Sequence, residues 1–398
     1  GRPVPSQRLA GGELAFLAVD VPPLGGRRFR VTAGAAPAGG TAGAEDSRAA
    51  ASGLALRLDP ATGAVASLAA GGRELVDASA HGLNEFLYVA GKSPADARRT
   101  GPVRITAPDA GPLVATLRVE CDAAPGVRAL VREYRLVDGL DWLAIRNELD
   151  KAAVREKEAI YFAFPFAVPD AVTRLDLGWG FIRPEADQLP GACRDFFTVQ
   201  RWADVSNQRF GVTWATVEAP LVTVGDMVDE TAHNDGPTGW KAHVASSNTV
   251  FSYAMNNYWR TNYKADQAGP ASFSYAVRPH GLFDALAAYR FGVERSQPLL
   301  VCPARDVAAP RSLFTVGSPA VVVTSLIPLP ERNGFLVRLY NAAGRPETVS
   351  LQWNRFQPAA VWLSNPSGTR LRPVDGPVPL PAFGLATLRV EGRYGSAE

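Results

Sequence analysis

The stretch "LALRLDPATGAVASLAAGGRELV", residues 54–76, decides the fold class of this chain. Leucine occupies every second position from 54 to 58, as on a strand that buries one face. The sequence "DPATG" at 59–63 supplies the Asp, Pro and Gly that favour a tight turn, and apolar residues return at 65–68. The stretch therefore predicts a β-hairpin.

The same pattern recurs along most of the chain. Short runs of alternating or continuous apolar residues are bounded by Gly, Pro, Asp or Asn roughly every 8 to 12 residues, which is typical of all-β proteins. The 398 residues include 37 glycines and 32 prolines, enough for many turns. Further strand candidates cover residues 113–121, 130–137, 142–149, 159–168, 209–217, 219–225 and 271–278. The sequence predicts an all-β fold with one large antiparallel β region.

The domain organisation follows from what flanks this region. Apolar residues at helical spacing occur over 281–295, and a Pro-rich connector leads from them to strand candidates over 312–392. We expect the large β region at 53–300 and a smaller C-terminal β-sandwich at 301–398. The low-complexity segment 33–52, rich in Ala and Gly, is expected to be a linker.

The N-terminal residues 1–32 contain only two strand candidates, at 13–20 and 27–32. Two strands do not make a stable domain alone. They are either the terminal strands of a small β domain whose beginning is absent, or they pack on the large β region.

Charge and hydropathy narrow the classes of partner. Lys and Arg number 41 against 39 Asp and Glu, so the net charge of +2 gives no basic field for nucleic acid. No apolar run reaches the roughly 18 residues of a membrane span, and the start of the chain has no apolar signal-peptide core. We expect a soluble, cytoplasmic protein without nucleic-acid or membrane partners. Cys121, Cys193 and Cys302 lie too far apart to indicate a disulfide framework or a cysteine zinc site.

Signatures of the common catalytic classes are missing from the sequence. It contains no GxSxG, P-loop, HExxH or EF-hand motif, and its four histidines are not at metal-binding spacing. Glycoside hydrolases use paired carboxylates, and the candidates here are Glu85, Glu156, Glu158, Asp187 and Asp204. Glu158 stands out because it directly precedes an apolar run, although a salt bridge with Lys157 or Arg155 explains it equally well. Carboxylates of this kind are more often solvated or ion-paired than catalytic, and we expect no metal site in this chain.

A dense polar and aromatic cluster lies in "SYAMNNYWRTNYKADQAGP", residues 252–270. Aromatic faces stack on the apolar face of a pyranose, and amides and hydroxyls match its hydroxyl groups, so the cluster is compatible with a sugar-binding surface. The alternative is a strand and turn in which Trp259 and Tyr263 are core residues and Asn256 and Asn257 serve the turn.

At these residues the sequence resembles a known family, the C-terminal β region of glycoside hydrolase family 38 α-mannosidases, especially the bacterial branch. The resemblance covers nearly the whole chain, firmly from about residue 5 to 300 and loosely beyond. The runs that carry it are 58–68, 81–89, 157–166, 183–207, 211–222 and 255–280.

The resemblance implies a large supersandwich similar to galactose mutarotase. It also implies that the aspartate nucleophile, the acid/base carboxylate and the zinc ion belong to an N-terminal barrel that this chain lacks. The chain would then be a fragment or a separately encoded C-terminal half that closes the cleft of that catalytic domain on a mannose-containing glycan. The positions expected to face the cleft are Asn84, Glu85, Asn256, Asn257, Tyr258, Trp259, Asn262 and Tyr263.

Two other functions remain open. One is a free-standing carbohydrate-binding or scaffolding module that uses the aromatic cluster. The other is a mutarotase-like or lyase-like enzyme on the same fold, which needs a His and a Glu in one groove. Its candidates are His81 or His280 with Glu85 or Glu158.

Overall fold

The computed structural model describes residues 2–37, 39–231, 240–258, 266–304 and 312–394. It divides into two compact units. The large unit comprises residues 1–17, 35–283 and 290–298, and the small unit comprises residues 18–34, 284–289 and 299–398.

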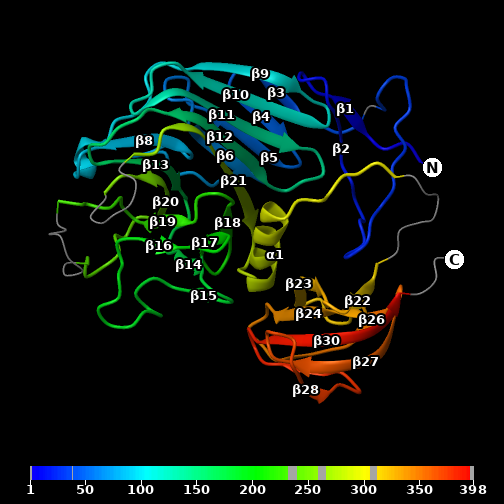
Figure 1. Ribbon diagram of the computed structural model, residues 1–398. Coiled ribbons are helices and arrows are strands. Elements are labelled where there is room, and N and C mark those ends of the chain that lie inside the picture. The colour runs from blue at the N-terminus through cyan, green and yellow to red at the C-terminus, as the bar shows by residue number, and fades with distance from the viewer. Residues whose placement is uncertain (1, 38, 232–239, 259–265, 305–311, 395–398) are drawn as a thin grey trace. The chain divides into compact units, whose positions relative to one another are not determined.

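The large unit contains a nine-stranded antiparallel sheet of order β15-β14-β17-β18-β21-β12-β11-β10-β9 (Figure 1). Its strands are β9 (Arg104–Ala110), β10 (Val114–Cys121), β11 (Val127–Val137), β12 (Leu143–Lys151), β14 (Val172–Asp176), β15 (Phe181–Ile182), β17 (Trp202–Ser206), β18 (Gly211–Thr216) and β21 (Gly269–His280). Each strand candidate that the sequence indicates between 113 and 149 is one of these strands.

Two five-stranded antiparallel sheets complete the main body of the large unit. One has the order β16-β19-β20-β13-β8, and the other is the meander β3-β4-β5-β6-β7. Their strands are β8 (Glu85–Ala90), β13 (Glu158–Pro165), β16 (Phe197–Thr198), β19 (Leu221–Val224), β20 (Thr249–Asn256), β3 (Gly43–Glu45), β4 (Arg48–Ala51), β5 (Leu54–Leu58), β6 (Val65–Ala70) and β7 (Arg73–Glu74). A short 3-10 helix, η1 (Pro94–Asp96), follows β8.

The core of the large unit is the space between its sheets. Phe164 of β13 lies 5.1 Å from Trp214 of β18 and 5.0 Å from Tyr275 of β21, measured between ring centroids. These residues belong to one continuous apolar cluster that also includes the meander. Since two large antiparallel sheets bury their facing sides against each other, the predicted all-β fold with a supersandwich is confirmed.

The opening hairpin forms as the sequence predicts, with Leu56 paired to Leu68. The side chain of Asp59 accepts hydrogen bonds from the backbone of Ala61 and Thr62, which shapes the turn. Gly63 adopts a φ of +66°, and a Cβ there would collide with Val119 and Arg132. The turn therefore requires glycine at this position.

A buried polar network holds this turn against the nine-stranded sheet. The side-chain amides of Asn84 and Asn147 bond to each other in both directions, at 2.9 and 2.8 Å. Asn84 also donates to the hydroxyl of Tyr134, which donates to the carbonyl of Gly63. The guanidinium of Arg132 donates to the carbonyl of Asn84. All four side chains are fully buried, and the network satisfies their polar groups except the Nε of Arg132, which is buried without a hydrogen-bond partner.

The N-terminal segment differs in part from its prediction. Strands β1 (Ser6–Arg8) and β2 (Leu14–Phe16) pair, and Gln7 bonds both Leu113 and Val114 at the start of β10. Strands β1 and β2 therefore pack on the large β region, whereas residues 18–34 belong to the small unit. Residues 27–32 form no strand; Val31, for example, is 71% exposed and has no buried face to hold it in a sheet.

Part of the predicted linker 33–52 is structured, because residues 43–51 form β3 and β4. Ala49 pairs with Leu56, and Ala49 and Ala51 enter the main core. The alanines that give this segment its low complexity are small enough to fit beneath the neighbouring strands.

The small unit has its own apolar core, built around Phe314, Phe335 and Phe356. Its antiparallel strands are β22 (Phe314–Val316), β23 (Val321–Pro328), β24 (Gly334–Asn341), β25 (Glu347–Val349), β26 (Leu351–Trp353), β27 (Phe356–Ser364), β28 (Arg370–Pro373), β29 (Val378–Leu380) and β30 (Leu385–Tyr394). The helix predicted over 281–295 is α1 (Ala285–Ser296). In the described part of the chain, no helix has the length and apolar character needed to cross a membrane.

Replacing Asn84 tests the buried network. Asn84→Ala removes the bonds to Asn147 and Tyr134 at a position with a φ of +60°. We expect the free energy of unfolding to fall by about 2–4 kcal/mol, because buried partners lose their hydrogen bonds. Urea unfolding followed by circular dichroism measures this. The exposed Gln208→Ala should change stability by less than about 0.5 kcal/mol, and equal midpoints for the two variants would contradict the role given to Asn84.

Candidate functional site

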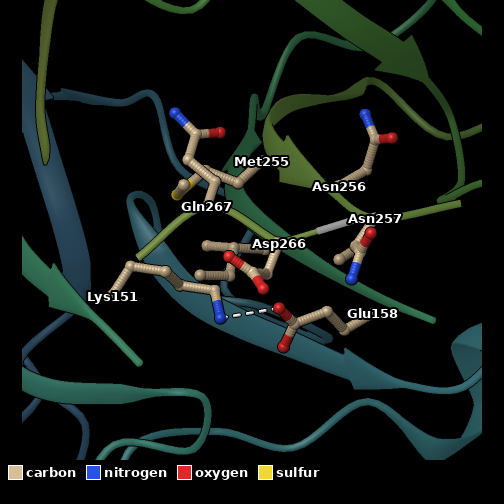
Figure 2. A pocket seen from close by; sticks show the side chains of 9 residues that line it. Lys151, Glu158, Met255, Asn256, Asn257, Asp266 and Gln267 are labelled. Atoms are coloured by element: carbon tan, nitrogen blue, oxygen red, sulfur yellow. Dashed lines mark ion pairs between the residues drawn. The ribbon is translucent and has the colours of Figure 1, made fainter. Parts of the chain in front are cut away.

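A polar pocket of about 450 Å³ opens at one end of the sandwich, where strands of both large sheets begin or end (Figure 2). Its walls come from the end of β12, the start of β13, the end of β20 and the segment that leads into β21. The described residues that line it are Lys151, Glu158, Ala159, Ile160, Met255, Asn256, Asn257, Asp266 and Gln267. We call this the polar pocket.

A buried ion pair forms one wall of the polar pocket. The ammonium of Lys151 lies 2.6 Å from a carboxylate oxygen of Glu158, and both side chains are at most 5% exposed. Lys151 also donates to the carbonyl of Ala152. Figure 2 shows the two side chains pointing toward each other. The second carboxylate oxygen of Glu158 is buried and makes no hydrogen bond.

This pair corrects the interpretation of Glu158 from the sequence. The partner is Lys151, not Lys157 or Arg155, because the connection 152–157 turns the chain back and brings the end of β12 to the start of β13. Arg155 instead pairs with Asp266, at 3.0 Å.

Asn257 and Tyr258 stabilise the wall of the pocket. The side chain of Asn257 donates to the carbonyls of Val154 and Glu156, which fixes the connection before β13. The hydroxyl of Tyr258 donates to the carbonyl of Gly91 at 2.8 Å. Burial, Glu230 and Glu158 raise the pKa of Tyr258, so it remains a neutral hydrogen-bond donor. Asn256, in contrast, is exposed and free to meet a ligand.

Asn84 and Glu85, two further residues predicted to face the cleft, do not line this pocket. Asn84 lies in the core network described above, so its expected place on the surface is wrong. Glu85 is 3% exposed and lies between Arg99, at 2.9 Å, and His81, at 3.5 Å. Trp259, Asn262 and Tyr263 lie outside the described residues.

The structure brings together His81 and Glu85, one of the pairs that a mutarotase-like enzyme would need. Both carboxylate oxygens of Glu85 are engaged, one by Arg99 and the other by the backbone N–H of Gly82. The edge of the His81 ring packs against Phe251. Glu85 is therefore held in an ion-pair cluster with Arg99 and His81.

His280 pairs with Asp204, which the sequence did not indicate as its partner. The ring Nε2 lies 2.7 Å from the carboxylate, which also accepts from Thr213 and Ser206. The pKa of His280 is raised because the Asp204 carboxylate outweighs burial, which by itself lowers it. Asp204 is fully buried, so the pair fixes β17 to β18 and β21.

The described residues contain no group of three or more His, Cys, Asp or Glu side chains able to hold a metal ion. Lys151 is not recognisable as a site residue from the sequence, because only the pairing of β12 with β21 shows that its strand ends at the pocket.

The polar pocket combines amide and carboxylate groups with an apolar floor. Asn256, Gln267 and Asp266 can donate to or accept from hydroxyl groups, while Ile160 and Met255 offer apolar contact. This mixture suits a neutral polyhydroxyl ligand.

Comparison with solved structures identifies the fold. A glycosyl hydrolase family 38 protein from Enterococcus faecalis is 14% identical, and the match covers 90% of this chain and 46% of that chain with a TM-score of 0.68. The chain has a family 38-like fold. An alpha-mannosidase from Enterococcus faecalis V583 is also 14% identical, with 89% of this chain and 43% of that chain covered and a TM-score of 0.66.

The match with this chain covers less than half the length of either Enterococcus protein. A galactose mutarotase-like protein from Clostridium acetobutylicum is 10% identical over 59% of this chain and 95% of that chain, with a TM-score of 0.39. Neither a scan against protein-family models nor a search of curated proteins finds a match.

Separating the ion pair of the polar pocket tests its contribution. We expect Lys151→Met alone to destabilise the protein by about 3–5 kcal/mol, because it leaves a buried carboxylate without a counter-charge. The double variant Lys151→Met/Glu158→Leu should recover most of that loss. Urea unfolding of wild type, both single variants and the double variant gives the coupling energy, and additive losses would refute a buried pair.

Asp176, a buried carboxyl group at the end of β14, should make the stability of the protein depend on pH. Burial raises its pKa to about 7, against a smaller opposing effect of Arg201. The unfolded carboxyl ionises near pH 4 while the folded one holds its proton, so stability falls as pH rises from about 4 to about 7.

Asp176→Asn should flatten this fall and stabilise the protein at pH 8 by up to about 4 kcal/mol. Thermal unfolding between pH 5 and pH 8 measures it. Asp187→Asn is the matched control, because Arg183 lowers the pKa of Asp187 to about 2 and its effect appears only as pH falls below about 4. Parallel pH profiles for wild type and Asp176→Asn would refute the assignment.

Proposed function

We propose that this chain is the non-catalytic C-terminal β portion of an α-mannosidase-like retaining glycoside hydrolase. In this proposal it closes one side of the substrate cleft of an N-terminal catalytic barrel that carries the nucleophile and the zinc ion. Its ligand is a mannose-containing glycan, and its protein partner is that catalytic domain.

The observation that carries the proposal is the extent of the shared fold. Ninety per cent of this chain superposes on the family 38 protein, and the match takes up 46% of that protein's length. The other Enterococcus protein, described as an alpha-mannosidase, agrees closely in extent and TM-score. Because this chain matches only part of a glycosidase, we expect it to form one portion of a larger enzyme of that kind.

The polar pocket supports a role in contacting sugar. Its polar groups, the exposed Asn256 and Gln267 and the partly buried Asp266, are of the kinds that pair with sugar hydroxyls. Contacts within the protein fix the walls of the pocket, because Asn257 bonds the connection before β13 and the Lys151–Glu158 pair forms one wall. Preorganised polar groups lose little entropy on binding, which favours the recognition of a small ligand.

The experiment uses the purified chain and two assays. We expect no turnover of an aryl α-mannoside, with or without added zinc, because the proposal assigns the catalytic groups to another domain. In calorimetry with mannose oligosaccharides, we expect weak binding that Asn256→Ala/Gln267→Ala reduces about tenfold or more, as the loss of two hydrogen bonds implies. Gln208→Ala, an exposed amide outside the pocket, should bind like wild type.

Turnover by the purified chain would overturn the non-catalytic role. Binding that the double variant leaves unchanged would remove the polar pocket from the proposal. No binding of any mannose oligosaccharide would contradict a contribution of this chain to the substrate cleft.

A further inference from the structure

A second hollow lies on the outer face of the nine-stranded sheet, across β11, β12 and β21. It has a volume of about 240 Å³, and Ala144, Ser274 and Ala276 form its floor. Ala144 pairs with Ala276 across the two strands, and Ser274 pairs with Arg146. Because these floor side chains end at or just beyond Cβ, the middle of the sheet face is indented.

The walls of this hollow are aromatic and strongly basic. Trp142 closes one side and packs against Phe291 of α1. Three guanidinium groups surround the hollow, from Arg135 on β11, Arg146 on β12 and Arg295 on α1. The lining contains one carboxylate, Glu133. We call this hollow the arginine pocket.

The three arginines differ in how far the protein neutralises them. Arg146 is bound by Glu148 at 2.7 Å. Glu133 is bound chiefly by Arg118, at 2.7 Å, and lies 4.0 Å from Arg135. Arg135 makes one further bond, from its Nε to the hydroxyl of Thr116.

Of the three arginines, Arg295 has the fewest contacts that neutralise its charge. Its guanidinium carbon lies 3.8 Å from the ring centroid of Trp142, and its Nε is buried without a hydrogen-bond partner. In the described part of the chain, no carboxylate forms an ion pair with it. Burial lowers the pKa of Arg295 despite the opposing attraction of Glu294, which forms no ion pair with it. A partly desolvated cation without a directly bonded carboxylate is unfavourable, so an anion in the hollow would lower the free energy of the folded state.

We propose that the arginine pocket binds a carboxylate-bearing monosaccharide, with the carboxylate on Arg295 and Arg135. A carboxylate matches the planar donor pattern of guanidinium groups. The sugar ring lies on the small-residue floor beside Trp142 and Val217, and its hydroxyls face Ser274 and Glu133. This site is distinct from the polar pocket, and the proposal does not depend on the function proposed for the chain.

Calorimetric titration of the full chain with glucuronic acid, glucose and inorganic phosphate tests the proposal. We expect glucuronic acid to bind at least about tenfold more tightly than either of the others, with an affinity that falls as salt rises. Arg135→Gln and Arg295→Gln should each weaken glucuronic acid binding by at least about tenfold. Arg135→Gln matters most, because Arg135 does not pack against Trp142 and its loss should leave the fold intact.

Arg128→Gln is the matched control, since Arg128 is an exposed arginine of β11 that pairs with Asp150 outside the pocket. Equal binding of glucose and glucuronic acid would overturn recognition of the carboxylate. Phosphate binding as tight as that of glucuronic acid would overturn recognition of the sugar. Equal losses in Arg128→Gln and Arg135→Gln would overturn the location. None of these results bears on mannose binding at the polar pocket, which other residues form.

Discussion

Strand β13 is the element on which the arrangement of the large unit depends, because it is buried on both faces. Phe162 and Phe164 enter the core between the sheets. On the opposite face Tyr161 stacks on Tyr253, with ring centroids 4.4 Å apart, in a second apolar cluster. A slip of one residue would bring Ala159, Tyr161 and Ala163 to the core face. It would also force the larger set of Ile160, Phe162 and Phe164 onto the opposite face, so both layers fix the register of β13. The polar pocket lies at the start of this strand, so the fixed register of β13 also fixes the positions of Glu158, Ala159 and Ile160 in the pocket wall.

Much of this architecture could be predicted, because it follows from local patterns. The alternating leucines at 54–58 and the turn at 59–63 define a hairpin whatever surrounds them. The unbroken apolar run at 159–164 indicates a fully buried strand, which β13 is. The helical spacing before the Pro-rich connector likewise gives α1.

The site could be predicted only in part, because it depends on contacts between distant residues. The local sequence around an asparagine that precedes an apolar strand does not show whether its side chain faces solvent or the core. Asn84 is buried because Asn147, far along the chain, supplies its partner. Similarly, only the sheet pairing shows that Lys151 meets Glu158, and that Ala144 and Ala276 leave a hollow between arginines. The expected roles of Trp259, Asn262 and Tyr263 remain predictions.

The pairing of β12 with β21 has a consequence for how the protein is made. These adjacent strands are separated by more than a hundred residues, which contain the whole of β13 to β20. During synthesis β12 emerges first, and its partner follows on the order of ten seconds later at ordinary elongation rates. Throughout that interval the edge of a hydrophobic, half-built sheet is unpaired, which is the condition under which nascent chains aggregate. The nine-stranded sheet is therefore completed only after β21 has been synthesised.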